Sequence, residues 1–245
     1  MLSNSYLPEM CQCGCVALLM SACKAENISY SPPHIQRALE NTAKRIPNLS
    51  FPQQGWGLIQ VDKAFEYLQA CKDLDYYDVY YDVRVENKNN KSGNDTSSLP
   101  RGIYLRQKDE TSIRQTFTIN VNPQFPKDLD ILESAQQQQR SKIDFEMKCN
   151  MKCDESWVTI PEHLLLTNNG RSFKVAVDPT GLPPGLHTAQ VCGTDSDHPE
   201  SGVVWYLPIT ITKPMDVERI VDLGELEVRQ WRVNRCLLLY RDLLS

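Results

Sequence analysis

The chain has 245 residues, of which 41% are hydrophobic and 23% are charged, a composition that suits one or two ordinary globular domains. Its net charge is −5 and its 26 basic residues are scattered, which argues against nucleic acid or an anionic membrane as a partner. No apolar run approaches the ~20 residues that a membrane-spanning helix needs. Residues 10–23 are apolar, but no basic segment precedes them as in a secretory signal, so we expect a cytoplasmic protein.

Three helices are predicted in the first 70 residues. The segment Cys13–Cys23 is small and apolar on every side, which is typical of a buried helix. Ser31–Ala43 follows, with Ser31 as a possible cap and Pro32 suited to the first turn. Gly55–Leu68 then combines a glycine turn with an amphipathic helix. The apolar stripes of the second and third helices are Ile35, Ala38, Leu39 and Thr42, and Val61, Ala64, Phe65 and Leu68.

The order of these segments, and the runs ALENTA and QGWGLIQVDKAFEYL, resemble the end of the peptidase domain in the tripeptidyl-peptidase II family of subtilisin-like serine peptidases. In that family a G-T-S-M-[SA]-S-P segment carries the nucleophilic serine, and counting back from Gly14 puts that serine at Tyr6. Residues Ser3–Gln12 read SNSYLPEMCQ, so the motif is missing. Ser5 lies one position away, but a serine is inert without an adjacent base. The resemblance places the triad's Asp and His upstream of this helix, so we expect no triad in this chain.

After Cys71 the hydrophobic period changes from 3.6 to 2, which indicates strands. The polar segment Asn87–Leu99 is predicted to be a flexible loop. Six to eight short strands over about 140 residues are typical of an antiparallel sandwich. The predicted strands are Tyr77–Val85, Gly102–Leu105, Ile113–Val121, Ile143–Cys153, Trp157–Ile160, Ser172–Val177, His187–Cys192 and Val203–Thr212.

The runs VDPTGLPPGLHTAQVCGTD and VVWYLPITITKP resemble the immunoglobulin-like domain that follows the peptidase domain in the same family. The predicted fold is therefore mixed α and β. Residues 13–72 would be the helical C-terminal remnant of a subtilisin-like α/β domain, and residues 75–213 an antiparallel, immunoglobulin-like β-sandwich. Residues 1–12 and 214–245 match neither part, and the latter is interpreted as a gene-model or alternative-exon tail, or as an interaction helix. We expect the sandwich to fold independently and the helices to fold poorly without the missing sheet.

No catalytic, cofactor-binding or metal-binding residue is predicted. Cys149 and Cys153 lie about 13 Å apart along a continuous strand, beyond the ~7 Å that a disulfide allows. Cys11, Cys13 and Cys15 could suggest a metal site, but no C-x-x-C pair supports it, and reduced, mostly buried cysteines are the interpretation.

The histidines also lack a catalytic setting. His34 is expected to be exposed or to cap its helix, since nothing nearby in the sequence makes it a base. His187, in a predicted strand, and His198, in a predicted loop, are interpreted as structural.

Three hypotheses for function remain. The resemblance implies a truncated piece of a cytosolic serine exopeptidase that releases N-terminal tripeptides from oligopeptides, inactive alone because the triad is absent. A non-enzymatic assembly or adaptor sandwich is the alternative, and a hydrolase with an unrecognised site is the third. The expected partners are further copies of the chain or a full-length peptidase, with peptide substrates bound only in that full-length context. No cofactor, nucleic acid or membrane is expected.

Overall fold

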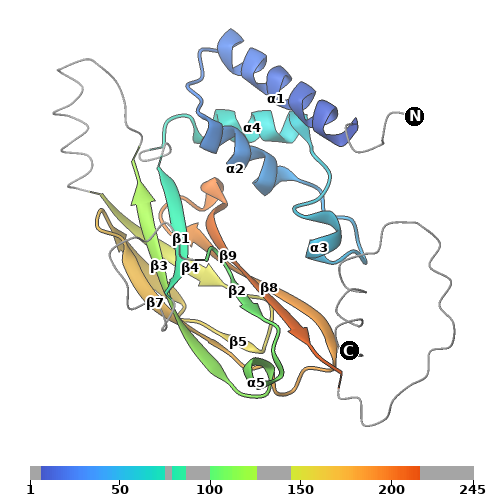
Figure 1. Ribbon diagram of the computed structural model, residues 1–245. Coiled ribbons are helices and arrows are strands. Elements are labelled where there is room, and N and C mark those ends of the chain that lie inside the picture. The colour runs from blue at the N-terminus through green and yellow to red at the C-terminus, as the bar shows by residue number, and fades with distance from the viewer. Residues whose placement is uncertain (1–6, 75–78, 87–99, 126–144, 216–245) are drawn as a thin grey trace, which may run out of the picture. The chain divides into compact units, whose positions relative to one another are not determined.

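The computed structural model of the chain (Figure 1) describes residues 7–74, 79–86, 100–125 and 145–215, with side chains from residue 12 onward. Ser5, Tyr6, the predicted loop 87–99 and nearly all of the segment 214–245 lie outside the described residues. The helices are α1 (Leu7–Ala25), α2 (Pro32–Thr42), α3 (Phe51–Gln54), α4 (Val61–Cys71), α5 (Lys108–Thr111) and the 3-10 helix η2 (Pro199–Ser201). The strands are β1 (Tyr80–Glu86), β2 (Ile103–Leu105), β3 (Gln115–Gln124), β4 (Glu146–Lys152), β5 (Val158–Thr159), β6 (His163–Thr167), β7 (Arg171–Val177), β8 (Gly185–Asp195) and β9 (Val203–Lys213).

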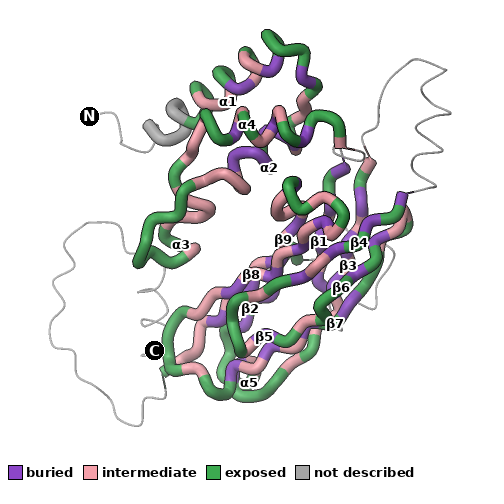
Figure 2. The backbone as a smooth tube through the Cα atoms, turned by 180° about the vertical axis from the view of Figure 1, so that it is seen from behind, coloured by how far each residue is buried: buried purple, intermediate pink, exposed green. Residues whose placement is uncertain are grey.

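The strands form two sheets packed face to face, as the period-2 pattern predicts. One sheet has the order β1-β3-β7-β5 and the other the order β2-β9-β8-β4-β6. Every pair is antiparallel except β2 with β9, which is parallel. The inner faces meet in one apolar core, visible as the purple positions that alternate along the strands in Figure 2. This arrangement is an antiparallel β-sandwich with one parallel edge pair.

The predicted faces of two strands are confirmed by burial. In β4, Met147, Cys149 and Met151 are buried and the residues between them are not. In β9, the alternate residues from Trp205 to Ile211 are buried in the same way. Strand β6 was not predicted, because its run Leu164-Leu165-Leu166 hides the alternation: Leu164 and Leu166 are buried, whereas Leu165 points outward and is exposed.

The helices share a second, smaller core. The stripe Ile35, Ala38 and Leu39 of α2 is buried against residues of α1 and α4, which confirms the predicted apolar face. Helix α1, predicted to be buried on every side, buries only Leu19 and Cys23 of its described side chains, and Leu18 is 61% exposed. The helix forms, but the part of the chain described here covers only one side of it (Figure 2). None of the described helices is long and apolar enough to cross a membrane.

Two predictions for the start of α2 need correction. Ser31 occupies the cap position, yet its side chain makes no capping hydrogen bond. His34 is not exposed but 1% accessible. The reason is that α2 has two buried faces, and His34 shares the second one with Arg37 and Asn41 at helical spacing.

That second face joins the helices to the sandwich. Arg37 Nη2 donates to the Val79 carbonyl over 2.8 Å. The amide of Asn41 bonds both the N–H and the carbonyl of Val203. From α4, Tyr67 Oη donates to the Ser201 carbonyl over 2.7 Å. These contacts place the helices at one end of the sandwich, next to the beginnings of β1 and β9 (Figure 1).

Candidate functional site

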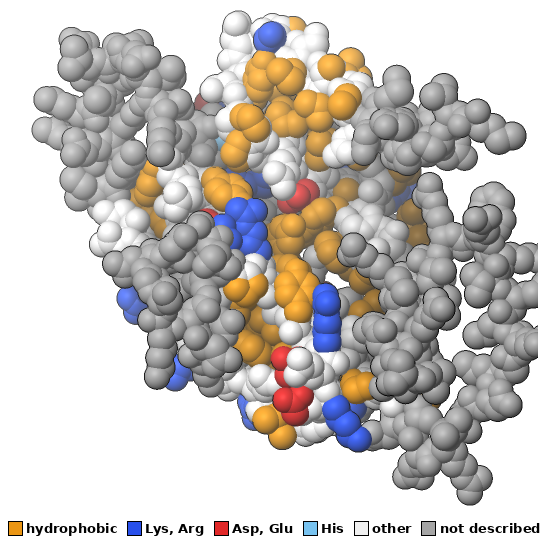
Figure 3. Space-filling model, viewed as in Figure 1, with side chains coloured by type: hydrophobic (Ala, Val, Ile, Leu, Met, Phe, Trp, Pro, Cys, Tyr) orange, Lys and Arg blue, Asp and Glu red, His pale blue; other side chains and the backbone are white. Residues whose placement is uncertain are grey.

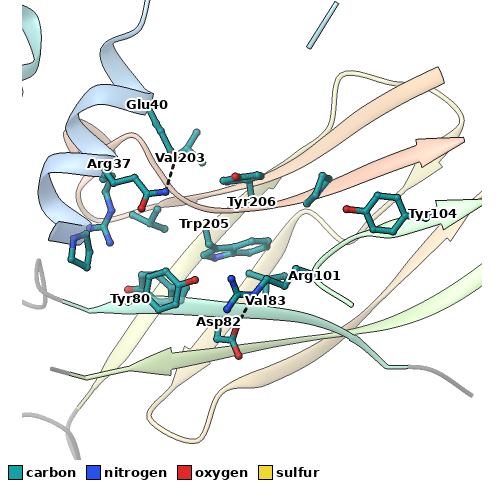
Figure 4. Close-up of a pocket in the computed structure, with 15 residues that line it drawn as sticks. Arg37, Glu40, Tyr80, Asp82, Val83, Arg101, Tyr104, Val203, Trp205 and Tyr206 are labelled. Atoms are coloured by element: carbon teal, nitrogen blue, oxygen red, sulfur yellow. Dashed lines mark hydrogen bonds and ion pairs between the residues drawn. The ribbon is translucent and has the colours of Figure 1, made fainter. Parts of the chain in front are cut away.

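A cavity of about 250 Å³ lies where α2 meets the sandwich (Figure 4). Its walls come from segments far apart in the chain: α2, the edge of β1, the start of β2 and the first half of β9. Aromatic rings and charged groups share the lining. The residues are Pro33, Gln36, Arg37, Glu40, Tyr80, Tyr81, Asp82, Val83, Arg101, Tyr104, Val203, Val204, Trp205, Tyr206 and Pro208.

Asp82 of β1 forms a charge cluster with Arg84 and Arg101 on the β1 side of this cavity. Asp82 accepts from Arg84 Nε over 2.9 Å, and Arg101 Nε approaches the same carboxylate at 3.7 Å. The side chain of Arg101 is 64% exposed, so the second ion pair is screened by water and contributes little to stability. Arg101 can therefore move without a large energetic cost.

At the upper end Glu40 and Arg37 belong to α2. Burial raises the pKa of the Glu40 carboxyl, while the hydrogen bond from Gln36 and the charge of Arg37 oppose that rise. Tyr206, from β9, also has a raised pKa because of burial. The Tyr80 and Tyr104 rings stay accessible, at 40% and 50% exposure. The cavity thus combines accessible aromatic rings with the charged side chains of α2.

The described side chains that line this cavity include no serine, threonine, cysteine or histidine. These are the residue types whose hydroxyl, thiol or imidazole commonly takes part in nucleophilic catalysis.

A second, larger hollow of about 960 Å³ opens between α1, α2 and the loop before α4. Hydrophobic side chains gather over the helices on the face shown in Figure 3. Trp56, on that loop, packs its ring edge-on against Tyr206 at 5.0 Å between centroids, which ties the loop to β9. The residues lining this groove are Gln12, Val16, Met20, Tyr30, Pro32, Ile35, Gln36, Leu39, Glu40, Ala43, Gln54, Trp56, Gly57 and Ile59.

Two of the histidines considered in the sequence contact residues close to them in the chain. His187 Nε2 lies 2.8 Å from the Pro183 carbonyl, and His198 Nδ1 lies 3.3 Å from Glu200 Oε1. Among the described residues no group of three or more His, Cys, Asp or Glu could hold a metal ion.

The cysteines of the described part are free thiols. They are Cys13, Cys15, Cys23, Cys71, Cys149, Cys153 and Cys192. Burial raises the pKa of both Cys149 and Cys192 to about 11, so these thiols stay protonated and are poor nucleophiles near neutral pH.

Sequence reasoning did not find the cavity. Tyr80 and Tyr104 occupy outward positions of their strands, where an aromatic residue is commonplace. Only the tertiary structure brings them beside Glu40 and Tyr206.

The fold and its helical layer define the class of protein: an immunoglobulin-like β-sandwich preceded by helices. Residues 80–212 match the family model for the first Ig-like domain of tripeptidyl-peptidase II. The chain belongs to the tripeptidyl-peptidase II family.

Relatives and a solved structure agree with that assignment. The chain is 40% identical over 222 residues to tripeptidyl-peptidase 2 of Arabidopsis thaliana, covering 89% of this chain and 15% of the relative. It is 33% identical over 205 residues to the Drosophila melanogaster protein of the same name, covering 84% and 13%. A crystal structure of tripeptidyl peptidase 2 superposes with a TM-score of 0.68 at 30% identity, covering 82% of this chain and 15% of that one. The chain therefore spans about 15% of the length of the proteins it matches.

Proposed function

We propose that the chain is a structural piece of a tripeptidyl-peptidase II-like serine exopeptidase, which releases tripeptides from the amino termini of oligopeptides in the cytoplasm. The observation that carries this proposal is the match of residues 80–212 to the first Ig-like domain of that peptidase. The solved tripeptidyl peptidase 2 covers 82% of the chain, which is more than the sandwich and thus supports a common origin for the helices as well.

Within that enzyme, residues 13–72 would be the last helices of the subtilisin-like domain and residues 75–213 its following sandwich. The shared hydrogen bonds support this joint role, because Asn41 and Tyr67 fasten the helices to the start of β9 and the turn before it. The apolar groove between α1 and α2 is the surface against which the rest of the peptidase domain would pack.

The chain alone is proposed to be inactive. Position 6 is a tyrosine where the family resemblance places the nucleophilic serine, and the carboxylate and histidine of a triad come from other segments. The test is hydrolysis of a fluorogenic tripeptide with a free amino terminus, together with labelling by a fluorophosphonate probe. We expect neither turnover nor labelling. Turnover with labelling that disappears in Ser5→Ala would overturn the proposal of inactivity.

A non-enzymatic assembly module is the second candidate. The observation that favours it is the wide apolar groove on the helices, which is large enough to receive a helix or strand of another chain. Sedimentation of the purified chain over a range of concentrations separates the two candidates. Self-association through the groove, abolished by Met20→Lys, favours the assembly module. A monomer at all concentrations favours the peptidase piece.

A further inference from the structure

Strand β1 presents one edge that none of the described strands covers. It lies at the end of its sheet and pairs with β3 on one side only. The opposite edge faces the cavity bounded by β9 and α2 (Figure 4). An uncovered edge displays backbone N–H and carbonyl groups that can pair with another extended chain.

The direction of these backbone groups follows from two hydrogen bonds. The Val79 carbonyl accepts from Arg37, and the Val85 N–H donates to the Pro100 carbonyl over 2.9 Å. Both bonds lie on the edge away from β3. Because backbone groups in an antiparallel strand point to alternate sides with a period of two residues, Tyr81 and Val83 direct their N–H and carbonyl groups to this same edge.

The partner strand agrees with that direction. Pro123 of β3 lies opposite Tyr81, and proline has no N–H to donate. Where the backbone groups of two opposite residues point away from each other, a proline removes no hydrogen bond between the strands. The four backbone groups of Tyr81 and Val83 therefore point into the cavity, and in the described part of the chain no other group bonds to them from that side.

Both ends of this edge are closed. Arg37 of α2 occupies the end at Val79, and Pro100 occupies the end at Val85. We call the open stretch between them, at Tyr81–Val83, the β1 seam. A second copy of β1 pairing antiparallel about Asp82 would place its residue 79 opposite Val85, where Pro100 already sits. In that register the closed ends block the pairing of two copies, and the open stretch between them has room for a segment of about three residues.

We propose that the β1 seam binds a short extended segment of another protein, about three residues long, by addition of a strand to β1. The site is independent of the peptidase role proposed above. Side chains of the added segment that lie opposite Tyr81 and Val83 would point inward, toward Val204 and Trp205, and would be apolar. The side chain between them would point outward beside Asp82, at the charged rim, and would be polar.

The pentapeptide acetyl-Ser-Val-Thr-Val-Ser-amide has this pattern and serves as the probe. The same peptide with both valines N-methylated keeps the side chains but lacks the two N–H groups that would bond to β1. Each is titrated into the ¹⁵N-labelled full chain, and amide chemical shifts and hydrogen exchange are recorded. A matched pair of variants is tested in the same way: Val204→Lys, in the part of β9 that lines the cavity beside the β1 seam, and Leu186→Lys, at an exposed position of β8 outside the cavity lining.

The expected result is a shift of the Tyr81 and Val83 amides and about tenfold slower exchange at both, with smaller changes at Asp82 and Arg84, whose amides already face β3. The N-methylated peptide and Val204→Lys should lose the effect, and Leu186→Lys should keep it. Unchanged Tyr81 and Val83 amides at millimolar peptide would overturn the proposal. Equal binding of both peptides, or the same shifts caused by protein concentration alone, would overturn it as well.

Discussion

The side-chain amide of Asn41 pairs with the backbone of Val203 as a neighbouring strand would. Its Nδ2 donates to the Val203 carbonyl at 3.1 Å, and its Oδ1 accepts from the Val203 N–H at 3.0 Å. The same Nδ2 also reaches the Ser201 carbonyl at 3.2 Å. One helical residue therefore satisfies the first backbone groups of β9 and fixes α2 on the sandwich. This contact links the two cores, together with the hydrogen bonds of Arg37 to Val79 and of Tyr67 to Ser201.

Replacing Asn41 by alanine should destabilise the chain by about 1–3 kcal/mol, because it leaves partly buried backbone groups of Val203 without a partner. The matched control is Gln36→Ala, which removes an exposed hydrogen bond on the same helix and should change the unfolding free energy by less than about 0.5 kcal/mol. Urea unfolding measures both. Equal stabilities for Asn41→Ala and Gln36→Ala would show that the amide does not hold the helices on the sandwich.

Gly193 of β8 should not tolerate a side chain. A Cβ at this position would overlap the indole ring of Trp205, which is 3% exposed in the sandwich core. Gly193→Ala should therefore cost about 1–3 kcal/mol, because the close-packed core must shift. Gly181→Ala, where a Cβ meets nothing within 4 Å, is the control and should be nearly neutral. Thermal unfolding of the two variants gives the comparison, and a neutral Gly193→Ala would mean that Trp205 packs elsewhere.

The raised pKa of Glu40 makes stability depend on pH. Burial is the largest cause of the rise, so the folded state binds this proton more tightly than the unfolded state. The resulting stability is fully present below the unfolded-state pKa of about 4.3, and it is lost as the pH rises through the higher folded-state pKa. Glu40→Gln should reduce the fall of the unfolding free energy with pH just above pH ~4.3. Urea unfolding between pH 4 and 7 tests this, with Glu66→Gln on α4 as the control for net charge. If the unfolding free energy of Glu40→Gln changed with pH as steeply as that of the unmodified chain, Glu40 would not have the raised pKa.

Alkylation should separate the cysteines by burial. Cys13 is exposed and should react with iodoacetamide at pH 8 in the folded chain. Cys149 is 1% exposed and its pKa is raised to about 11, so it should react only after unfolding. Peptide mass spectrometry after timed labelling reads both sites at once. Rapid modification of Cys149 without denaturant would contradict the buried position of this strand.

Most strands of the sandwich, and the faces that they bury, could be predicted from the sequence. Strands such as β4 and β9 alternate apolar and polar residues, because one face meets the core and the other does not. Strand β6 could not be predicted from such alternation, because Leu165 is exposed between two buried leucines and the run looks uniformly apolar. The parallel pairing of β2 with β9 also left no local signal, because only three residues take part.

The contacts between helices and sandwich were not predictable in the same way. His34, Arg37 and Asn41 look like an ordinary polar face of α2, and polarity alone suggests exposure to solvent. The partners of Arg37 and Asn41 are Val79 and Val203, which come more than 40 residues later in the chain (Arg37 to Val79 spans 42 positions). The cavity was missed for the same reason, since its walls meet only in the tertiary structure.

The central claim, that this chain is the part of a tripeptidyl-peptidase II-like enzyme that closes its peptidase domain, is tested most directly by complementation. The segment of Arabidopsis thaliana tripeptidyl-peptidase 2 that precedes its match to this chain would be co-expressed with the chain, and hydrolysis of a fluorogenic tripeptide measured. We predict co-purification and turnover that neither part shows alone, with both lost when Met20→Lys places a charge in the apolar groove. Failure of the two parts to associate, or turnover by this chain without its partner, would contradict the claim.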